Sequence, residues 1–378
     1  MINNAQTRRP LKKTALGSIL FAGALLAVAV IAEAQQPARI PRIGLIFGPS
    51  RSGSKDQVDG FRQGLRDRGY IEDQNIVLDY RYGEGKEDLL RDLAGDLVHL
   101  KVDVIVTSST VAAITAKQLT RTIPIVLAGT GDPVATGLVA SLARPRGNVT
   151  GLSAASPELS TKQLDLLREI VPKVSRVAVL YDPRGPVNVR AWKEIEVIAT
   201  AFRIQLIRLE VRGPEDYELA LTAAARKRAD ALLVRRAPLN QTYQTQIVSL
   251  ANRDKLPAIY PIRQYVKVGG LMSYGIDSSH LNRRAAHYVD KILKGAQPVD
   301  LPVEQPTKFE FVVNLKTARQ IGVTIPSEVL MTNSYCSLKR YTGAQMGTDQ
   351  NRSSLYQNGA GNFLAFAVVR RLVRPLRN

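Results

Sequence analysis

Cysteine is nearly absent from the chain: Cys336 is the single cysteine among 378 residues. One cysteine excludes a disulfide framework, an iron–sulfur cluster and a cysteine-built zinc site. Histidine is almost as scarce, with three widely spaced residues and no HExxH motif, so we expect no metal site. The sequence also lacks GxxxxGK[ST] and a well-placed GxGxxG, and therefore predicts no cofactor.

Basic side chains outnumber acidic ones by 52 to 33, and the formal net charge is +19. Residues 1–34 contain four basic and one acidic side chain, residues 331–378 contain seven and one, and the remaining +10 is spread over residues 35–330. A nucleic-acid surface would gather basic residues in one stripe with interleaved aromatics, and aromatics make up only 6% of the chain. The sequence therefore predicts no nucleic-acid partner.

The first 34 residues have the pattern of a secretory signal peptide. Four basic residues within 8–13 precede an apolar stretch at 15–31, and Ala32-Glu33-Ala34 provides an A-x-A cleavage site. An uncleaved membrane anchor is the alternative, because the apolar stretch approaches the length that spans a bilayer. The cleavage site and the absence of a later stop-transfer stretch favour an exported, periplasmic protein.

Past the cleavage site, short apolar runs alternate with helical patterns. The first half predicts strands at 42–47, 75–80, 102–107 and 123–128, separated by helices at 57–68, 86–100 and 108 to about 120. The pattern restarts with a helix at 159–171 and a strand at 176–181, and it continues to residue 321. Because such alternation is typical of doubly wound sheets, we predict an α/β fold with two doubly wound parallel-sheet lobes and a ligand cleft between them.

Residues 331–378 differ from the rest of the chain. They are polar and irregular up to a basic, apolar stretch at 363–377. We expect a poorly ordered basic tail, which is common at chain ends. An amphipathic segment that binds a membrane surface is the alternative.

Several motifs resemble the substrate-binding proteins of ABC transporters, in the family with tryptophan- and tyrosine-binding members. They include FRQGLRDRGY at 61–70, VDVIVTSST at 102–110, SRVAVLYDP at 175–183 and GGLMSYG at 269–275. The most specific is KILKGAQPVDLPVEQPTKFEFVVNLKTARQIGVTIP at 291–326. The resemblance extends over residues 42–326, nearly the whole mature chain.

This resemblance implies the type I periplasmic binding fold, a small-molecule ligand, an ABC permease in the inner membrane as partner, and a monomer. We then expect lobe 1 to span residues 40–150 plus about 276–306. Lobe 2 would span residues 151–275 plus about 307–330. Thr150 and Gly151 are expected at the first crossover, where a glycine can absorb hinge rotation.

Two features depart from the resemblance. Family members often have an aspartate-proline pair after the strand at 231–234, where this chain has Arg235-Arg236-Ala237-Pro238. If that acid holds an amino group in the relatives, the ligand of this chain is not an ordinary amino acid. The second departure is the tail, which matches nothing in the family and would fit a frameshift or a fused segment.

Side chains that follow the strands of lobe 1 are the first candidates for ligand contacts. Ser108, Ser109 and Thr110 lie where a buried strand meets its helix, and the unpaired N–H groups of a helix start suit a carboxylate. One of the three can equally be an N-cap. Ser50 follows the first strand in a Ser/Gly loop, and Asp132 would either pair with a ligand ammonium or form a turn.

Further candidates belong to lobe 2 and the crossovers. Tyr181, Asp182 and Asn188 are expected to face the cleft from a strand end and a helix start, and Asp182 would hold a ligand ammonium or form a turn or cap. Asp277 would cap the helix that follows it or touch the ligand. Tyr274 would stack on an apolar ligand group or pack in the core.

No residue is expected to act in catalysis, because the sequence lacks GxSxG, a metal-ligand cluster and a histidine near a candidate serine. The sequence predicts the exported solute-binding component of an ABC import system, which captures a small amino-acid-like or carboxylate ligand by hinge closure. Two alternatives remain: a ligand-sensing subunit for a membrane receptor on the same fold, and a cleft hydrolase.

Overall fold

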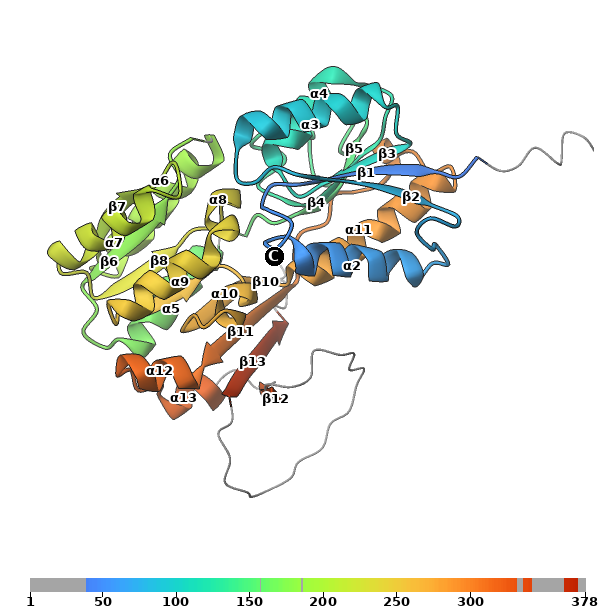
Figure 1. Ribbon diagram of the computed structural model, residues 1–378. Helices are drawn as coiled ribbons and strands as arrows, with labels where there is room; N and C mark the ends of the chain where they lie inside the picture. The colour runs from blue at the N-terminus through green and yellow to red at the C-terminus, as the bar shows by residue number, and fades with distance from the viewer. Residues whose placement is uncertain (1–38, 157, 185, 332–335, 342–363, 373–378) are drawn as a thin grey trace, which may run out of the picture. The chain divides into compact units, whose positions relative to one another are not determined.

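The computed structural model describes residues 39–331 except 157 and 185, together with the segments 336–341 and 364–372. Its compact unit begins at Pro41 and contains two β-sheets, each covered by helices (Figure 1). We call the first sheet with its helices lobe 1, and the second sheet with its helices lobe 2. The predicted α/β fold with two mainly parallel sheets is confirmed.

Lobe 1 contains a parallel sheet with the strand order β2-β1-β3-β4-β5. The strands are β1 (Arg42–Phe47), β2 (Val77–Tyr82), β3 (Val104–Thr107), β4 (Ile125–Thr130) and β5 (Val149–Ser153). The helices are α2 (Lys55–Arg66), α3 (Glu87–His99), α4 (Thr110–Leu119) and α11 (Ser278–Leu293). Alternate residues of β1 face opposite ways: Ile43 and Leu45 pack in the core under α2 and α11, and Ile46 packs under α3 and α4 (Figure 1).

Lobe 2 contains the strand order β7-β6-β8-β9-β10-β11, parallel except for β11. The strands are β6 (Arg176–Tyr181), β7 (Gln205–Glu210), β8 (Ala231–Val234), β9 (Ala258–Tyr260), β10 (Met272–Ile276) and β11 (Lys308–Asn314). The longer helices are α5 (Glu158–Ile170), α6 (Pro186–Ala201), α7 (Asp216–Arg226) and α9 (Gln244–Arg253). The shorter ones are α8 (Pro238–Thr242), α10 (Arg263–Lys267), α12 (Leu315–Ile321) and α13 (Ser327–Met331).

The chain passes between the lobes three times. β5 leads to α5, β10 leads to α11, and the short 3-10 helix η1 (Pro298–Asp300) leads to β11. Two crossings are joined beside β5, because Ser153 donates its N–H to the carbonyl of Glu304 (2.8 Å) and Glu304 donates to the carbonyl of Gly151 (2.9 Å). Few backbone segments would therefore bend if the angle between the lobes changed.

Short elements such as β5, α8, α10 and α13 are not predicted by the sequence pattern. β5 occupies residues 149–153, where the sequence analysis places a crossover. α8 and α10 have five residues each, too few to show a helical period. The residue boundaries of the lobes drawn from the sequence stay predictions.

The expected poorly ordered tail contains two strands, β12 (Cys336–Tyr341) and β13 (Leu364–Leu372). β13 pairs antiparallel with β11, and β12 pairs antiparallel with β13. The run of β13, LAFAVVRRL, is rich in residues of high β-propensity, and pairing covers the backbone groups that β11 would otherwise expose. The other residues of the tail lie outside those that the structure describes.

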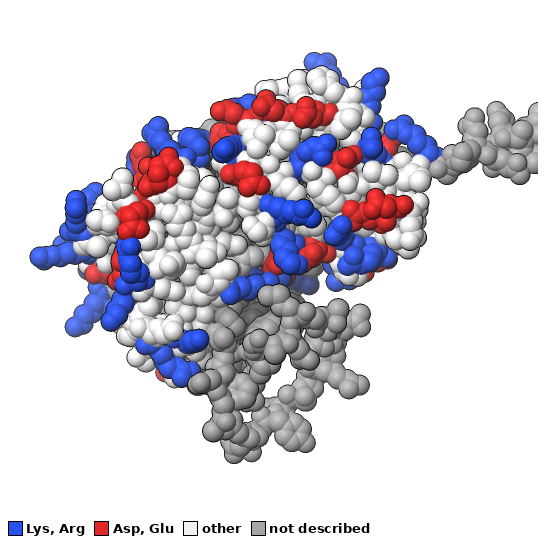
Figure 2. Space-filling view, in the orientation of Figure 1, with Lys and Arg blue, Asp and Glu red and all other residues white. Residues whose placement is uncertain are grey.

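The predicted signal peptide at 1–34 also lies outside the described residues. No helix in the described part of the chain combines the length and apolar character needed to cross a bilayer. On the face shown in Figure 2, basic and acidic side chains are interspersed over both lobes. This agrees with the diffuse basic charge seen in the sequence.

Gly151 provides a test of the packing in lobe 1. Its φ is +122°, and a Cβ there would lie 2.3 Å from the carbonyl oxygen of Leu127. Gly151→Ala should lower the free energy of unfolding by about 3 kcal/mol, because backbone strain adds to the clash.

Gly137→Ala is the matched control, since its φ is +70° but nothing lies within 4 Å of the Cβ position. This variant should lose only about 1 kcal/mol, from backbone strain alone. Thermal unfolding of both variants measures the difference. Equal shifts in Tm would contradict the close packing of β5 against β4.

Candidate functional site

Loops at the carboxyl ends of the strands bring the two lobes into contact. Ser50, which follows β1, donates its N–H to Oγ1 of Thr242 at the end of α8 (3.0 Å). Gly48 lies so close to α8 that a Cβ there would be 2.8 Å from Cγ of Pro238. In open α/β sheets ligands bind at this end of the strands. The residues buried beside this contact therefore define the candidate site.

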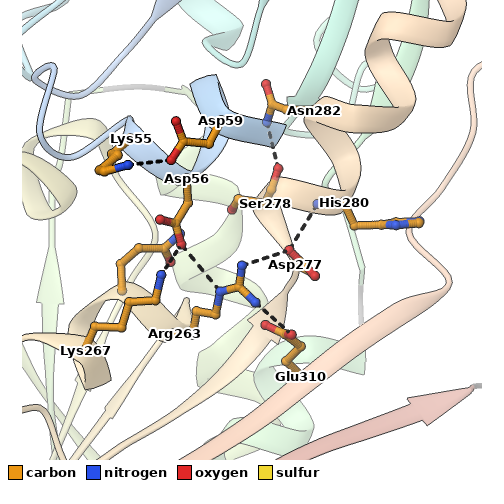
Figure 3. Close-up of polar contacts among 11 residues, drawn as sticks. Lys55, Asp56, Asp59, Arg263, Lys267, Asp277, Ser278, His280, Asn282 and Glu310 are labelled. Carbon is orange, nitrogen blue, oxygen red and sulfur yellow. Dashed lines mark hydrogen bonds and ion pairs between the residues drawn. The ribbon is translucent and has the colours of Figure 1, made fainter. Parts of the chain in front are cut away.

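Asp56 in the first turn of α2 links lobe 1 to α10 of lobe 2 (Figure 3). Its Oδ2 accepts from Nζ of Lys267 (2.7 Å) and Nε2 of Gln264 (3.0 Å), and it lies 3.5 Å from Nε of Arg263. Burial raises the pKa of Asp56, but Lys267 and Arg263 outweigh burial, so the pKa lies below its ordinary value of 3.8. The carboxylate is therefore charged at neutral pH.

Arg263 joins three acidic groups. Besides Asp56, its guanidinium lies 3.2 Å from Oε1 of Glu310 in β11 and 3.8 Å from Oδ1 of Asp277 at the crossover into α11 (Figure 3). Burial lowers the pKa of Arg263, and the three carboxylates raise it by more. Together with Lys267, the cluster joins two basic side chains of α10 to carboxylates of α2, β11 and the crossover into α11.

Two amide side chains beside this cluster have oxygen atoms without hydrogen-bond partners. Gln264 donates Nε2 to Asp56, and Asn282 donates Nδ2 to the carbonyl of Ser278 (2.9 Å). These bonds fix the orientation of each amide, so Oε1 of Gln264 and Oδ1 of Asn282 are acceptors. Both oxygens are buried and unpartnered.

Other unpartnered polar atoms lie in α2, in α11 and in the loop before α2. They are the hydroxyls of Ser54 and Ser278 and Oε1 of Gln57, all buried. An unpaired buried polar group costs roughly 1–3 kcal/mol, so a native protein keeps few of them.

The candidate residues predicted in lobe 1 make local hydrogen bonds. Ser109 is the N-cap of α4 and accepts a backbone N–H at 3.3 Å, while Oγ1 of Thr110 accepts the N–H of Gly131 at 3.1 Å. Asp132 accepts two backbone N–H groups in its own turn, both at 3.0 Å. Ser108 is half-buried at the same strand end. Their ligand role stays a prediction.

In lobe 2, Asp182 is buried and paired with Arg184, which donates Nε to Oδ1 (2.9 Å) and Nη2 to Oδ2 (2.8 Å). A ligand ammonium at Asp182 would have to compete with that pair. Tyr181 packs edge-on against Trp192, with ring centroids 5.4 Å apart, inside the core of the lobe. Asn188 lies near the start of α6, and its side chain is outside what the structure describes.

Asp277 and Ser50 are the predicted residues that the structure brings to the lobe contact. Asp277 caps α11 by accepting the N–H of His280 (3.1 Å), and it also belongs to the Arg263 cluster. Ser50 reaches α8, as described above. Tyr274 instead stacks on Phe309 in lobe 2, with centroids 6.0 Å apart.

The two residues predicted as hinge lie inside β5. Oγ1 of Thr150 donates to the carbonyl of Leu301 (2.6 Å), and Gly151 pairs with Leu127 of β4. The chain leaves the sheet after Ser153, so the crossover begins two residues beyond Gly151. Assignment of the hinge to Thr150 and Gly151 stays a prediction.

Sequence reasoning missed Asp56, Arg263, Gln264 and Asn282. A usable signal exists, because Gln57 and Asn282 are amides at buried positions of amphipathic helices.

A cavity of about 240 Å³ lies among the crossover segments, lined by residues such as Leu152, Asp277 and Pro306. Among the described residues, no group of three or more His, Cys, Asp or Glu side chains could hold a metal ion.

Comparison with known proteins places the chain in a family. It matches the family model of ABC transporter substrate binding proteins over residues 43–335. A tyrosine-binding protein of Clostridioides difficile (strain R20291) is 28% identical over 280 residues, which cover 74% of this chain and 79% of that protein. The protein belongs to the ABC transporter substrate-binding protein family, because the family match covers well over half of the chain.

Solved structures agree with this family. A conserved domain protein from Vibrio cholerae O1 biovar eltor has a TM-score of 0.73 and 29% identity, covering 77% of this chain and 98% of that one. An ABC domain from Streptococcus pneumonia, solved in complex with L-Trp, has a TM-score of 0.70 and 28% identity, covering 77% and 97%. The resemblance and the type I fold are thus confirmed, and the family is one of binding proteins, not enzymes.

The link between Asp56 and α10 predicts an effect on lobe opening. Asp56→Asn should favour the open form by roughly 1 kcal/mol, about fivefold, because Lys267 and Arg263 lose their partner in lobe 1 and Lys267 is half-exposed. Small-angle X-ray scattering should show a larger radius of gyration. Asp59→Asn is the control, since Asp59 pairs only with Lys55 of its own helix (2.6 Å), and it should leave the radius unchanged.

The same experiment has a pH dependence. The pKa of Asp56 is lowered in the folded chain, so its contribution is complete at pH values above the ordinary 3.8 and is lost as the pH falls through the lowered pKa. The unmodified protein should therefore shift toward the open form as the pH falls below 3.8, and Asp56→Asn should not show this step. Identical acid profiles for the two proteins would contradict the role of Asp56.

Proposed function

We propose that this protein is the exported solute-binding component of an ABC import system, and that it captures a small amino-acid-like or carboxylate ligand by closing its two lobes. The observation that carries the proposal is the set of buried, unpartnered polar atoms beside the lobe contact, in a chain of the substrate-binding protein family. Binding would replace the missing hydrogen bonds and hold the lobes together.

The chemistry of the site supports a ligand with donor groups. Oε1 of Gln264 and Oδ1 of Asn282 are acceptors that suit the N–H groups of an ammonium, and a carboxylate of the adjacent cluster lies close to Gln264. The relatives named above are described as tyrosine-binding and as a complex with L-Trp. A small ligand with an amino or hydroxyl group and an aromatic or carboxylate part fits both observations.

The remaining parts of the proposal concern export and partners. The signal sequence predicted at 1–34 would send the chain to the periplasm, where the closed form would deliver its ligand to a permease in the inner membrane. We propose that the protein acts there as a monomer. The crossover segments after Ser153, Ile276 and Glu304 would bend during closure.

Ligand binding can be measured by thermal unfolding of the exported protein, purified from the cells that process it. The panel contains aromatic amino acids, aromatic acids without an amino group, aliphatic amino acids and small carboxylates. A ligand at 100 times its Kd should stabilise the native state by about 2.7 kcal/mol and raise Tm by a few degrees.

Two results would contradict the proposed function. One is a Tm that no compound of the panel changes. The other is turnover of a panel compound, which would indicate an enzyme. As a binding control, Asp59→Asn should respond to every ligand as the unmodified protein does, because Asp59 lies outside the unpartnered cluster.

A further inference from the structure

A second group of unpartnered polar atoms lies in lobe 2, at the carboxyl ends of β8 and β9. Arg236 follows β8 in the loop that leads to α8. β8 pairs with β9, which ends at Tyr260, and the ring of Tyr260 stacks on Tyr265 of α10 with centroids 4.8 Å apart. Both tyrosines are completely buried.

The polar atoms of this group have no hydrogen-bond partners among the described residues. Nη1 of Arg236 and the hydroxyls of Tyr260 and Tyr265 are all buried without a hydrogen bond. No carboxylate among the described residues forms an ion pair with Arg236. The three groups share one property, which is that each can donate a hydrogen bond.

The neighbouring arginine shows that this state is specific to Arg236. Nη1 of Arg235 donates to Oγ of Ser160 in α5 (2.8 Å), so its buried end is satisfied. The two guanidinium groups therefore differ in their hydrogen bonding although they are adjacent in the sequence. Of these two arginines, Arg236 is the one with a buried N–H group that has no hydrogen-bond partner among the described residues.

The electrostatics of the group favour an anion. Burial lowers the pKa of Arg236 to about 10, which still leaves it charged at neutral pH. Burial also raises the pKa of Tyr265 well above 10, so its hydroxyl keeps its proton. The residue is partly buried, but its Nη1 is buried without a hydrogen bond, which is costly, and an anion bound there would offset that cost with a charge-assisted hydrogen bond.

The position of the group relates it to the lobe contact. α8 and α10 flank it, and these are the helices whose Thr242 and Lys267 touch lobe 1. An anion that reaches Arg236 would therefore lie beside the candidate site described above, whose unpartnered oxygens belong to Gln264 and Asn282.

We propose that Arg236, with the hydroxyls of Tyr260 and Tyr265, forms an anion subsite that receives the carboxylate of the ligand. The inference rests on the proposed function and deepens it, because it names the substrate class. The ligand is a small organic acid with its carboxylate toward α8 of lobe 2 and its N–H or O–H donors toward Gln264 and Asn282. Arg236 is then a specificity-determining residue.

The test compares acids with their neutral amides by isothermal titration calorimetry on the exported protein. The matched pairs are 3-(4-hydroxyphenyl)propanoate with its amide, and L-tyrosine with L-tyrosinamide. Tyramine, which lacks the carboxylate, completes the set. The unmodified protein should bind each acid at least about tenfold more tightly than the matched amide, the usual size of a charge-assisted hydrogen bond.

Arg236→Gln should reduce this acid-to-amide ratio to near one, because a neutral glutamine does not favour a charged carboxylate over the matched amide. Arg235→Gln is the control, because Arg235 is already paired with Ser160, and it should keep the ratio even if Tm falls. If Arg236→Gln does not fold, Arg236→Lys provides the test. Lysine retains the positive charge but lacks the planar guanidinium with its paired N–H donors, so the acid-to-amide affinity ratio should fall only in part.

Each outcome decides the inference. A ratio near one in the unmodified protein, or a full ratio in Arg236→Gln, would overturn the subsite but leave the proposed function standing. Tight binding of tyramine would do the same. Inorganic phosphate alone should not raise Tm. If phosphate does raise Tm and Arg236→Gln abolishes this effect, Arg236 binds free inorganic anions and the proposed carboxylate subsite is wrong. No binding of any compound would contradict both proposals.

Discussion

Polar atoms that are buried where the two lobes meet must find hydrogen-bond partners, and this constraint governs the account of the protein. Asp56 finds partners in Gln264 and Lys267 of the opposite lobe. Oδ1 of Asn282 and Oε1 of Gln264 have no hydrogen-bond partner in the part of the chain that the structure describes. In the proposed function, a ligand supplies the missing donors as the lobes bury them, so binding and closure are one equilibrium.

Most of the fold follows from local patterns. The run VIVT at 104–107 is β-branched throughout, as favours a parallel strand covered on both faces, and β3 forms there. Longer helices such as α3 show their period over three turns, but α8 and α10 are shorter than two turns and show none. β13 pairs with β11, and a local sequence pattern does not predict pairing between strands that are distant in the sequence.

The site was less predictable, because it depends on which polar atoms remain unpaired after folding. The sequence identifies Thr110 and Asp182 as polar residues at strand ends, but it does not show that Gly131 and Arg184 already occupy them. Asp56 and Arg263 are distant in the sequence and meet only across the lobes. Arg236 is visible as a basic residue after a strand, whereas its lack of an acidic partner depends on the folded chain.

The most direct test of the account is a crystal structure of the exported protein with the tightest ligand of the aromatic panel. The account predicts a ligand between the lobes, with donor atoms within hydrogen-bond distance of Oε1 of Gln264 and Oδ1 of Asn282. A ligand in the cavity beside Leu152 and Pro306 would contradict it. So would a bound form in which water molecules alone satisfy the two oxygens.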